Sequence, residues 1–168
     1  MGLGENLRLR EIPSGKYEVK DIRNMILLSK ENDNFIPDVV VIDYFSCLKK
    51  PYAKNSWEAE EKMMRELEAI AQEFKIAIHL FEQMKNLNTM EDAKAMDADI
   101  AKGSSTKGQI ASFIFEFLRS KEQKGNNRAD FIIKKTRDTG MAKGDSYFEN
   151  IYFNPSTCEI DLKQGRDV

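Results

Sequence analysis

Helical and strand patterns alternate along the first half of the chain. From Val19 to Leu28 apolar residues recur at helical spacing, which predicts an amphipathic helix that the polar run 32–34 ends. Residues 39–42 are all apolar and β-branched, the pattern of a strand buried on both faces of a parallel sheet. The clearest helix follows, with Ser56 as its candidate N-cap. Its apolar stripe is formed by Met63, Met64, Leu67, Ile70, Ala71 and Phe74.

A second buried strand is predicted over residues 76–81, so that strand, helix and strand form a right-handed parallel crossover unit. Near the start of the chain, Leu7 and Leu9 alternate with arginines, which suggests a further short strand. His79 and Trp57 lie within predicted elements, and we expect both side chains to belong to the core.

The second half of the chain changes to a period of two. Every second residue of 113–117 is a phenylalanine, a turn is predicted at 124–127, and the answering strand begins at Phe131. Further strands are expected over 147–153 and 158–162. The pattern therefore predicts an α/β fold with parallel strands first and an antiparallel extension at its C-terminal edge.

Length and composition restrict the function classes. With 168 residues the chain is long enough for one compact domain, and we assign residues 1–168 to a single domain. The formal net charge of −2 argues against coating by nucleic acid through bulk charge, but leaves DNA binding by local loops open. The apolar runs are too short to span a bilayer, and the two cysteines match no metal-ligand spacing. We therefore expect a reducing, cytoplasmic compartment and no membrane partner.

Two polar residues follow the predicted parallel strands. Asp43 comes directly after residues 39–42, and Gln83 lies just past residues 76–81. Because ligands bind at the carboxyl ends of parallel strands, Asp43 could orient a hydrated Mg²⁺ and Gln83 could contact a phosphate group. The alternatives are an acidic residue that merely ends its strand and a polar residue that begins a loop.

Basic residues in two other segments suit phosphate groups. Lys135 and Arg137 follow the strand that begins at Phe131, and side chains at i and i+2 of an extended segment point the same way. The segment 102–108 combines glycines, hydroxyl groups and lysines, which suits contact with a nucleic-acid backbone. A solvated strand end and a flexible connector are the alternatives.

In their order, these segments resemble the C-terminal RecA-type ATPase domain of DnaB-like replicative helicases, closest to the phage-type branch. Pro37–Tyr44 is similar to the family's Walker B strand, and the strand before Gln83 is similar to its glutamine-bearing strand. Asp99–Ser105 resembles the family's DNA loop, and Ile132–Gly140 resembles its Lys-x-Arg-Asn-Gly segment. The resemblance covers residues from about 7 to 160 and implies a RecA-like fold.

The resemblance also implies a role for each candidate residue. Asp43 would position Mg²⁺, Gln83 would sense the γ-phosphate of ATP, and Lys135 and Arg137 would reach the nucleotide of a neighbouring subunit. The DNA backbone would be held by Lys102, Gly103, Ser104 and Lys107. Enzymes of the family form ring hexamers that translocate on single-stranded DNA using ATP, and a primase or a helicase loader is a candidate partner.

The family's phosphate-binding loop is missing from the sequence. These 168 residues contain no Gly-x-x-x-x-Gly-Lys-Ser/Thr, so we expect a fold that is incomplete on its N-terminal side. The chain would then be either part of a longer helicase or a variant that cannot hydrolyse ATP by itself. Two other functions stay open: another RecA-fold ATPase, recombinase or KaiC-like, and a non-catalytic domain that binds DNA or forms a ring interface.

Overall fold

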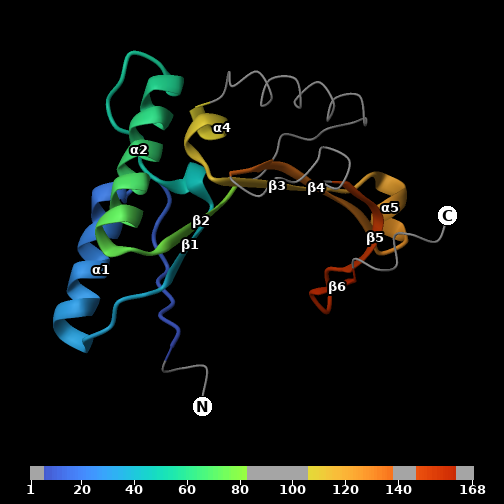
Figure 1. Ribbon diagram of the computed structural model, residues 1–168, viewed down its shortest axis with the longest axis horizontal. Coiled ribbons are helices and arrows are strands. Elements are labelled where there is room, and N and C mark those ends of the chain that lie inside the picture. Colours follow the sequence, from blue (N-terminus) through green and yellow to red (C-terminus); the bar gives the residue numbers. More distant parts are fainter. Residues whose placement is uncertain (1–5, 83–105, 138–146, 162–168) are drawn as a thin grey trace. The chain divides into compact units, whose positions relative to one another are not determined.

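The computed structural model of the protein describes residues 6–82, 106–137 and 147–161 (Figure 1). The chain divides into two compact units, Met1–Met84 (unit 1) and Lys85–Val168 (unit 2). Within the described residues, unit 1 contains a two-stranded sheet and unit 2 a four-stranded sheet. The assignment of both units to a single domain stays a prediction.

Unit 1 is a strand–helix–strand unit preceded by a helix. Its elements are α1 (Val19–Asp33), β1 (Val39–Asp43), the 3-10 turn η2 (Phe45–Cys47), α2 (Ser56–Phe74) and β2 (Ala77–Phe81). The two strands pair in parallel, from Val39 opposite Ala77 to Asp43 opposite Phe81. α1 packs against α2, and α2 packs against β2. The predicted parallel pairing across a helix is therefore confirmed.

The core of unit 1 lies between the two helices and one face of the sheet. Its buried side chains include four of the six residues in the predicted stripe on α2. They are Val19, Ile22, Ile26, Ile42, Phe45, Leu48, Ala59, Met63, Met64, Leu67 and Ile70. Because full burial of one large aliphatic side chain contributes about 1.5–3 kcal/mol, this cluster holds the helices to the sheet.

Local signals set the ends of the helices. Asn34 ends α1 in the left-handed region at φ 50°, which asparagine tolerates, and its N–H donates to the carbonyl oxygen of Ser29. α2 begins after Asn55, whose side-chain oxygen accepts a hydrogen bond of 2.8 Å from the N–H of Glu58.

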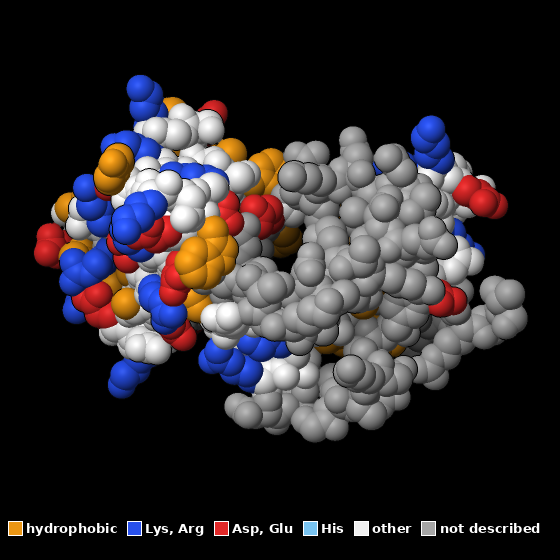
Figure 2. Space-filling view, turned by 90° about the horizontal axis from the view of Figure 1, so that it is seen from above, with side chains coloured by type: hydrophobic (Ala, Val, Ile, Leu, Met, Phe, Trp, Pro, Cys, Tyr) orange, Lys and Arg blue, Asp and Glu red, His pale blue; other side chains and the backbone are white. Residues whose placement is uncertain are grey.

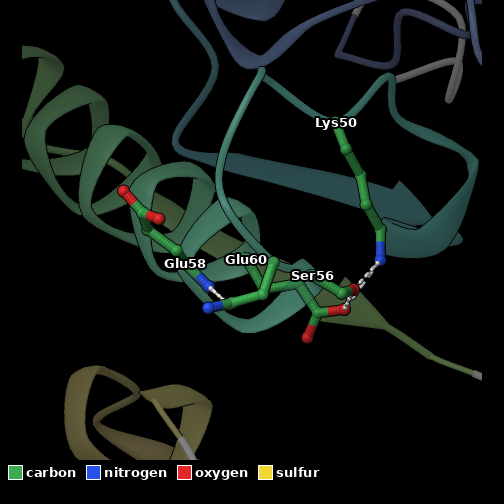
Figure 3. A network of polar contacts seen from close by, with 5 residues as sticks. Lys50, Ser56, Glu58 and Glu60 are labelled. Carbon is green, nitrogen blue, oxygen red and sulfur yellow. Dashed lines mark hydrogen bonds and ion pairs between the residues drawn. The ribbon is translucent and has the colours of Figure 1, made fainter.

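The prediction of Ser56 as the N-cap of α2 is wrong by one residue. Figure 3 shows that the Ser56 hydroxyl instead accepts a hydrogen bond from the ammonium group of Lys50, at 2.8 Å. The same ammonium group lies 2.9 Å from a carboxylate oxygen of Glu60. This contact joins the segment that follows β1 to the first turn of α2.

The second face of the β1–β2 sheet is uncovered. Val39 is 48%, Val41 57% and Phe81 55% exposed. The prediction of strands buried on both faces is wrong, because among the described residues the helices cover only the face that carries Ile42. His79 of β2 is likewise exposed instead of lying in the core.

Two further core and strand predictions are wrong. Trp57 lies in the first turn of α2 with 55% of its surface exposed, beyond the apolar stripe that faces α1. Leu7 and Leu9 lie in a segment without regular structure, and Leu9 is 90% exposed. Alternation gives a strand only where a neighbouring strand satisfies the backbone hydrogen bonds, and no described strand pairs with this segment.

Unit 2 is an antiparallel sheet with two short helices. Its elements are α4 (Thr106–Ile110), β3 (Phe113–Leu118), α5 (Lys121–Gly125), β4 (Arg128–Thr136), β5 (Tyr147–Asn154) and β6 (Glu159–Asp161). The strands pair in the order β3-β4-β5-β6, so the predicted antiparallel extension is confirmed. The turn predicted at 124–127 includes the end of α5, which begins with a capping box between Ser120 and Gln123.

A β-bulge interrupts the pairing of β3 with β4. Glu116 pairs with Ile132 and Ile114 with Lys135, so β4 has one residue more than β3 between these pairs. In a regular strand Lys134 and Lys135 would project from opposite faces. The additional residue lets both project from the face that carries Ile114 and Glu116.

The opposite face of this sheet is aromatic. The ring of Phe131 lies 5.7 Å from that of Phe115 and 5.3 Å from that of Phe117, measured between centroids. Phe117 also lies 5.3 Å from Phe153 of β5. Ring pairs in these offset and tilted arrangements attract one another beyond their burial. The alternation in 113–117 therefore separates an aromatic face from a face that carries charged residues.

Candidate functional site

Asp43 is the last residue of β1, at the carboxyl end of the parallel pair. Its carboxylate is exposed. No group of three or more potential metal-ligating side chains occurs in the described ranges 6–82, 106–137 and 147–161. Mg²⁺ is commonly held by one or two carboxylates and completes its shell with water and phosphate oxygens. Asp43 therefore fits a metal ion that is shared with a nucleotide.

Lys135 and Arg137 converge on the C-terminal end of α4. The Lys135 Nζ donates hydrogen bonds of 2.5 and 3.2 Å to the carbonyl oxygens of Gly108 and Gln109. The Arg137 Nη2 donates bonds of 2.8 and 3.2 Å to the carbonyl oxygens of Gln109 and Ile110. Three consecutive carbonyl groups thus bind two cations, and the side chains point the same way, as their spacing predicts.

The electrostatics of this contact follow from the helix end. The last carbonyl groups of a helix lack intrahelical partners and carry partial negative charge, which attracts cations. Burial of the Lys135 ammonium group lowers its pKa, and the nearby charge of Arg137 lowers the pKa further. The shared carbonyl oxygens offset this repulsion and hold the two like charges side by side.

A buried ion pair fixes the strand that carries these cations. The side chains of Lys134 and Glu116 are only 4% and 7% exposed, and Nζ lies 3.2 Å from Oε2. Lys134 directly precedes Lys135, so the ion pair anchors β4 at the bulge. Sequence analysis missed this pair. The available signal was an acidic residue at a position that faces inward between phenylalanines, together with two adjacent lysines.

The other predicted site residues are described only in part. Gln83, Lys102, Gly103 and Ser104 lie outside the described residues. Lys107 belongs to α4, and its backbone alone is described. Of the predicted residues, the structure brings together Lys135 and Arg137, both in unit 2, whereas Asp43 belongs to unit 1. It adds the carbonyl end of α4 to this group.

Charges of both signs are mixed on the surface of unit 1. Figure 2 shows Lys and Arg side chains interspersed with Asp and Glu side chains. Some form ion pairs, such as Arg23 with Glu73 at 2.6 Å. The mixture agrees with the net charge of −2, so binding of nucleic acid would depend on local contacts. Among the described helices, none combines the length and the apolar character that a membrane span requires.

Comparison with known proteins identifies the family. Residues 6–154 match the family described as DnaB-like helicase C terminal domain, and this match includes most of both units. The chain belongs to this family. The resemblance stated from the sequence is therefore confirmed. A search of curated proteins gave no match.

Solved structures of DnaB-like helicases share the fold. One of them, an ATPase domain, is similar with a TM-score of 0.59 at 18% identity, over 86% of this chain and 51% of that one. A DnaB-like replicative helicase, whose structure was described with its interactions with primase, gives 0.57 at 17% identity, over 83% and 33%. The chain thus spans about half the length of the first protein and a third of the second. The predicted α/β, RecA-like fold is confirmed.

Proposed function

We propose that the chain is part of an ATP-dependent replicative DNA helicase and acts at the interface between neighbouring subunits of a ring hexamer. There it would couple ATP hydrolysis to translocation on single-stranded DNA. Membership of the DnaB-like family over residues 6–154 supports this assignment over a recombinase or KaiC-like ATPase. The observation that carries the finer proposal is the pair of cations Lys135 and Arg137 at the end of β4.

The chemistry of phosphoryl transfer explains why a cation pair matters. Negative charge develops on the transferred group, and an arginine from a neighbouring subunit often stabilises it. Within the described part of the chain, Arg137 donates side-chain hydrogen bonds only through Nη2, and its side chain is exposed. Its Nε and Nη1 groups can therefore donate to a phosphate of the neighbouring subunit. Lys135 is less exposed and donates to two carbonyl oxygens, so Arg137 is the main candidate for this contact.

ATP and Mg²⁺ are the proposed cofactors of the complete enzyme. Asp43 would hold the metal ion, which supplies positive charge to the phosphate oxygens, and Gln83 would contact the γ-phosphate. Single-stranded DNA would be bound by Lys102, Gly103, Ser104 and Lys107. The proposed partners are further copies of the chain in a ring and a primase or helicase loader, in the cytoplasm of a bacterial host if the protein is phage-encoded.

Stimulation of hydrolysis in trans tests the role of Arg137. The chain is mixed with a DnaB-like ATPase domain that has an intact phosphate-binding loop but lacks its own trans-acting arginine. Because these 168 residues contain no such loop, the chain alone should not hydrolyse ATP, whereas the mixture should. An arginine supplied in trans accelerates hydrolysis by about 10³–10⁵, so Arg137→Ala should remove nearly all of the stimulation.

Arg65→Ala is the matched control, since Arg65 lies on α2 and pairs only locally with Glu61. It should leave the stimulation unchanged. If the Arg137→Ala mixture hydrolyses ATP as fast as the unsubstituted mixture, Arg137 does not act on the neighbour's nucleotide.

A non-catalytic domain that binds DNA or forms a ring interface is the second candidate. The missing phosphate-binding loop favours it for these 168 residues. It predicts that the chain binds labelled oligo(dT) or assembles with other subunits, while ATP hydrolysis in the mixture does not rise. The two functions are therefore separated by the same experiment.

A further inference from the structure

We propose that the carbonyl end of α4 is a latch that holds Lys135 and Arg137, so that engagement of Arg137 by a phosphate group loosens α4. The α4 latch consists of the carbonyl groups of Gly108, Gln109 and Ile110 and the two cationic side chains. The inference rests on the proposed function only where it concerns DNA.

The stability of α4 depends on these contacts. α4 has five residues, and a helix of that length is not stable by itself in water. Its last carbonyl groups need partners from outside the helix, and the two side chains of β4 supply them. Directly after α4, the Arg137 N–H donates a backbone hydrogen bond of 2.9 Å to the carbonyl oxygen of Ser112. The end of β4 therefore positions α4.

The two cations differ in how firmly the latch holds them. Lys135 is partly buried and donates to two carbonyl oxygens, whereas Arg137 is exposed and uses one nitrogen. A phosphate group is a stronger acceptor for a guanidinium than a neutral carbonyl, because the bond is charge-assisted on both sides. A phosphate would therefore draw Arg137 from Gln109 and Ile110, while Lys135 keeps its contact with Gly108.

This arrangement links two parts of the proposed mechanism. In the sequence α4 directly follows residues 102–104, which the proposed function assigns to DNA. Whatever changes the position of α4 also changes how strongly Arg137 is held, because coupling between two equilibria is reciprocal. Lys135 is then a positioning residue, which acts on DNA binding through α4 and does not touch the DNA.

Hydrogen exchange of the complete chain, measured by mass spectrometry from milliseconds to seconds, tests the latch. Lys135→Met should speed exchange in 106–112 by about tenfold, the size expected for a lost hydrogen bond to a charged group. Exchange in β3 and β4 should stay unchanged, and Lys135→Arg should restore protection. The control is Lys121→Met, which removes an exposed lysine of α5. Unchanged exchange in α4, or equal acceleration throughout unit 2, would overturn the proposal.

Inorganic pyrophosphate tests the role of Arg137 in the latch. At saturating pyrophosphate, exchange in 106–112 should rise in the unsubstituted chain. It should not rise further in Arg137→Gln, in which the latch has already lost that cation. An absent effect in the unsubstituted chain, or an equal effect in both, contradicts the coupling.

Binding of fluorescent oligo(dT) at several salt concentrations separates this inference from the proposed function. Lys135→Met should weaken binding severalfold without changing the salt dependence, whereas loss of a direct phosphate contact would lower the slope of log K against log salt by about one. A lower slope means that Lys135 itself contacts DNA, which contradicts its positioning role. If the unsubstituted chain does not bind oligo(dT), the proposed DNA contact is wrong, while the exchange experiment alone decides the latch.

Discussion

The ion pair between Lys134 and Glu116 offers a quantitative test of the sheet that carries the cations. Lys134→Met keeps most of the volume of the side-chain stem and removes its charge. Glu116 then remains in a site where its side chain is 7% exposed. The substitution therefore measures what a buried carboxylate costs when its lysine is gone.

The expected magnitude follows from the distance and the burial. At 3.2 Å and an effective dielectric constant of about 20, the attraction between the two charges is about 5 kcal/mol. Removal of each charge from water costs several kcal/mol, so the pair as a whole contributes little. Loss of one partner is different, because the remaining charge keeps its desolvation cost. We expect Lys134→Met to lower the free energy of unfolding by about 3–5 kcal/mol.

The double variant Lys134→Met, Glu116→Leu is the matched control. It removes both charges and should unfold within about 1 kcal/mol of the unsubstituted chain or be more stable. Urea denaturation followed by amide NMR signals of β3 and β4 reports on unit 2, and fluorescence of Trp57 reports on unit 1. Equal losses in the single and double variants would show that packing, not charge, determines the cost. A loss below about 1 kcal/mol would mean that the pair behaves as a surface ion pair.

Three further predictions concern single contacts. Asp130→Ala should lower the free energy of unfolding by about 2–3 kcal/mol, because its buried carboxylate accepts hydrogen bonds of 2.8 and 2.9 Å. Thermal denaturation checks this against Glu159→Ala on β6, and equal melting temperatures would contradict it. Asn55→Ala removes the N-cap of α2 and should cost about 1 kcal/mol in urea denaturation, and an unchanged midpoint would show that the cap is dispensable. Two lysines lower the pKa of Glu18 to about 2 from its usual 4.5, so its contribution to stability is present above pH 4.5 and is lost as the pH falls through about 2. Glu18→Gln should flatten this part of the stability profile, most clearly at low salt, and an identical profile would refute the pairing.

The elements of the fold were predictable where a local pattern determines them. The stripe on α2 repeats at helical spacing and meets α1 and β2, so both the helix and most of its buried residues follow from the sequence. Asn34 ends α1 because its side chain tolerates the left-handed conformation. Covering of a strand is not a local property. Val39 and Val41 have the composition of buried residues, but which face receives a helix depends on packing elsewhere in the chain.

The candidate site was predictable in part for the same reason. The spacing of Lys135 and Arg137 indicates that the two side chains share a direction, and the hydrogen bonds agree with this. Their acceptors could not be predicted, because backbone carbonyl groups have no residue type and any sequence at 108–110 supplies them. The exposed position of Asp43 at a strand end followed from the apolar run before it.

The β-bulge at Lys134 makes the cation pair depend on the length of the chain more than on its residue types. Deletion of one residue between Ile133 and Lys135 would give regular pairing with β3, but it would turn every later side chain of β4 to the other face of the sheet. Lys135 and Arg137 would then project among the phenylalanines, away from the carbonyl groups of α4. In related sequences we therefore expect substitutions in this stretch to be common and insertions or deletions to be rare. A gap there would mark a relative in which the cations have another role.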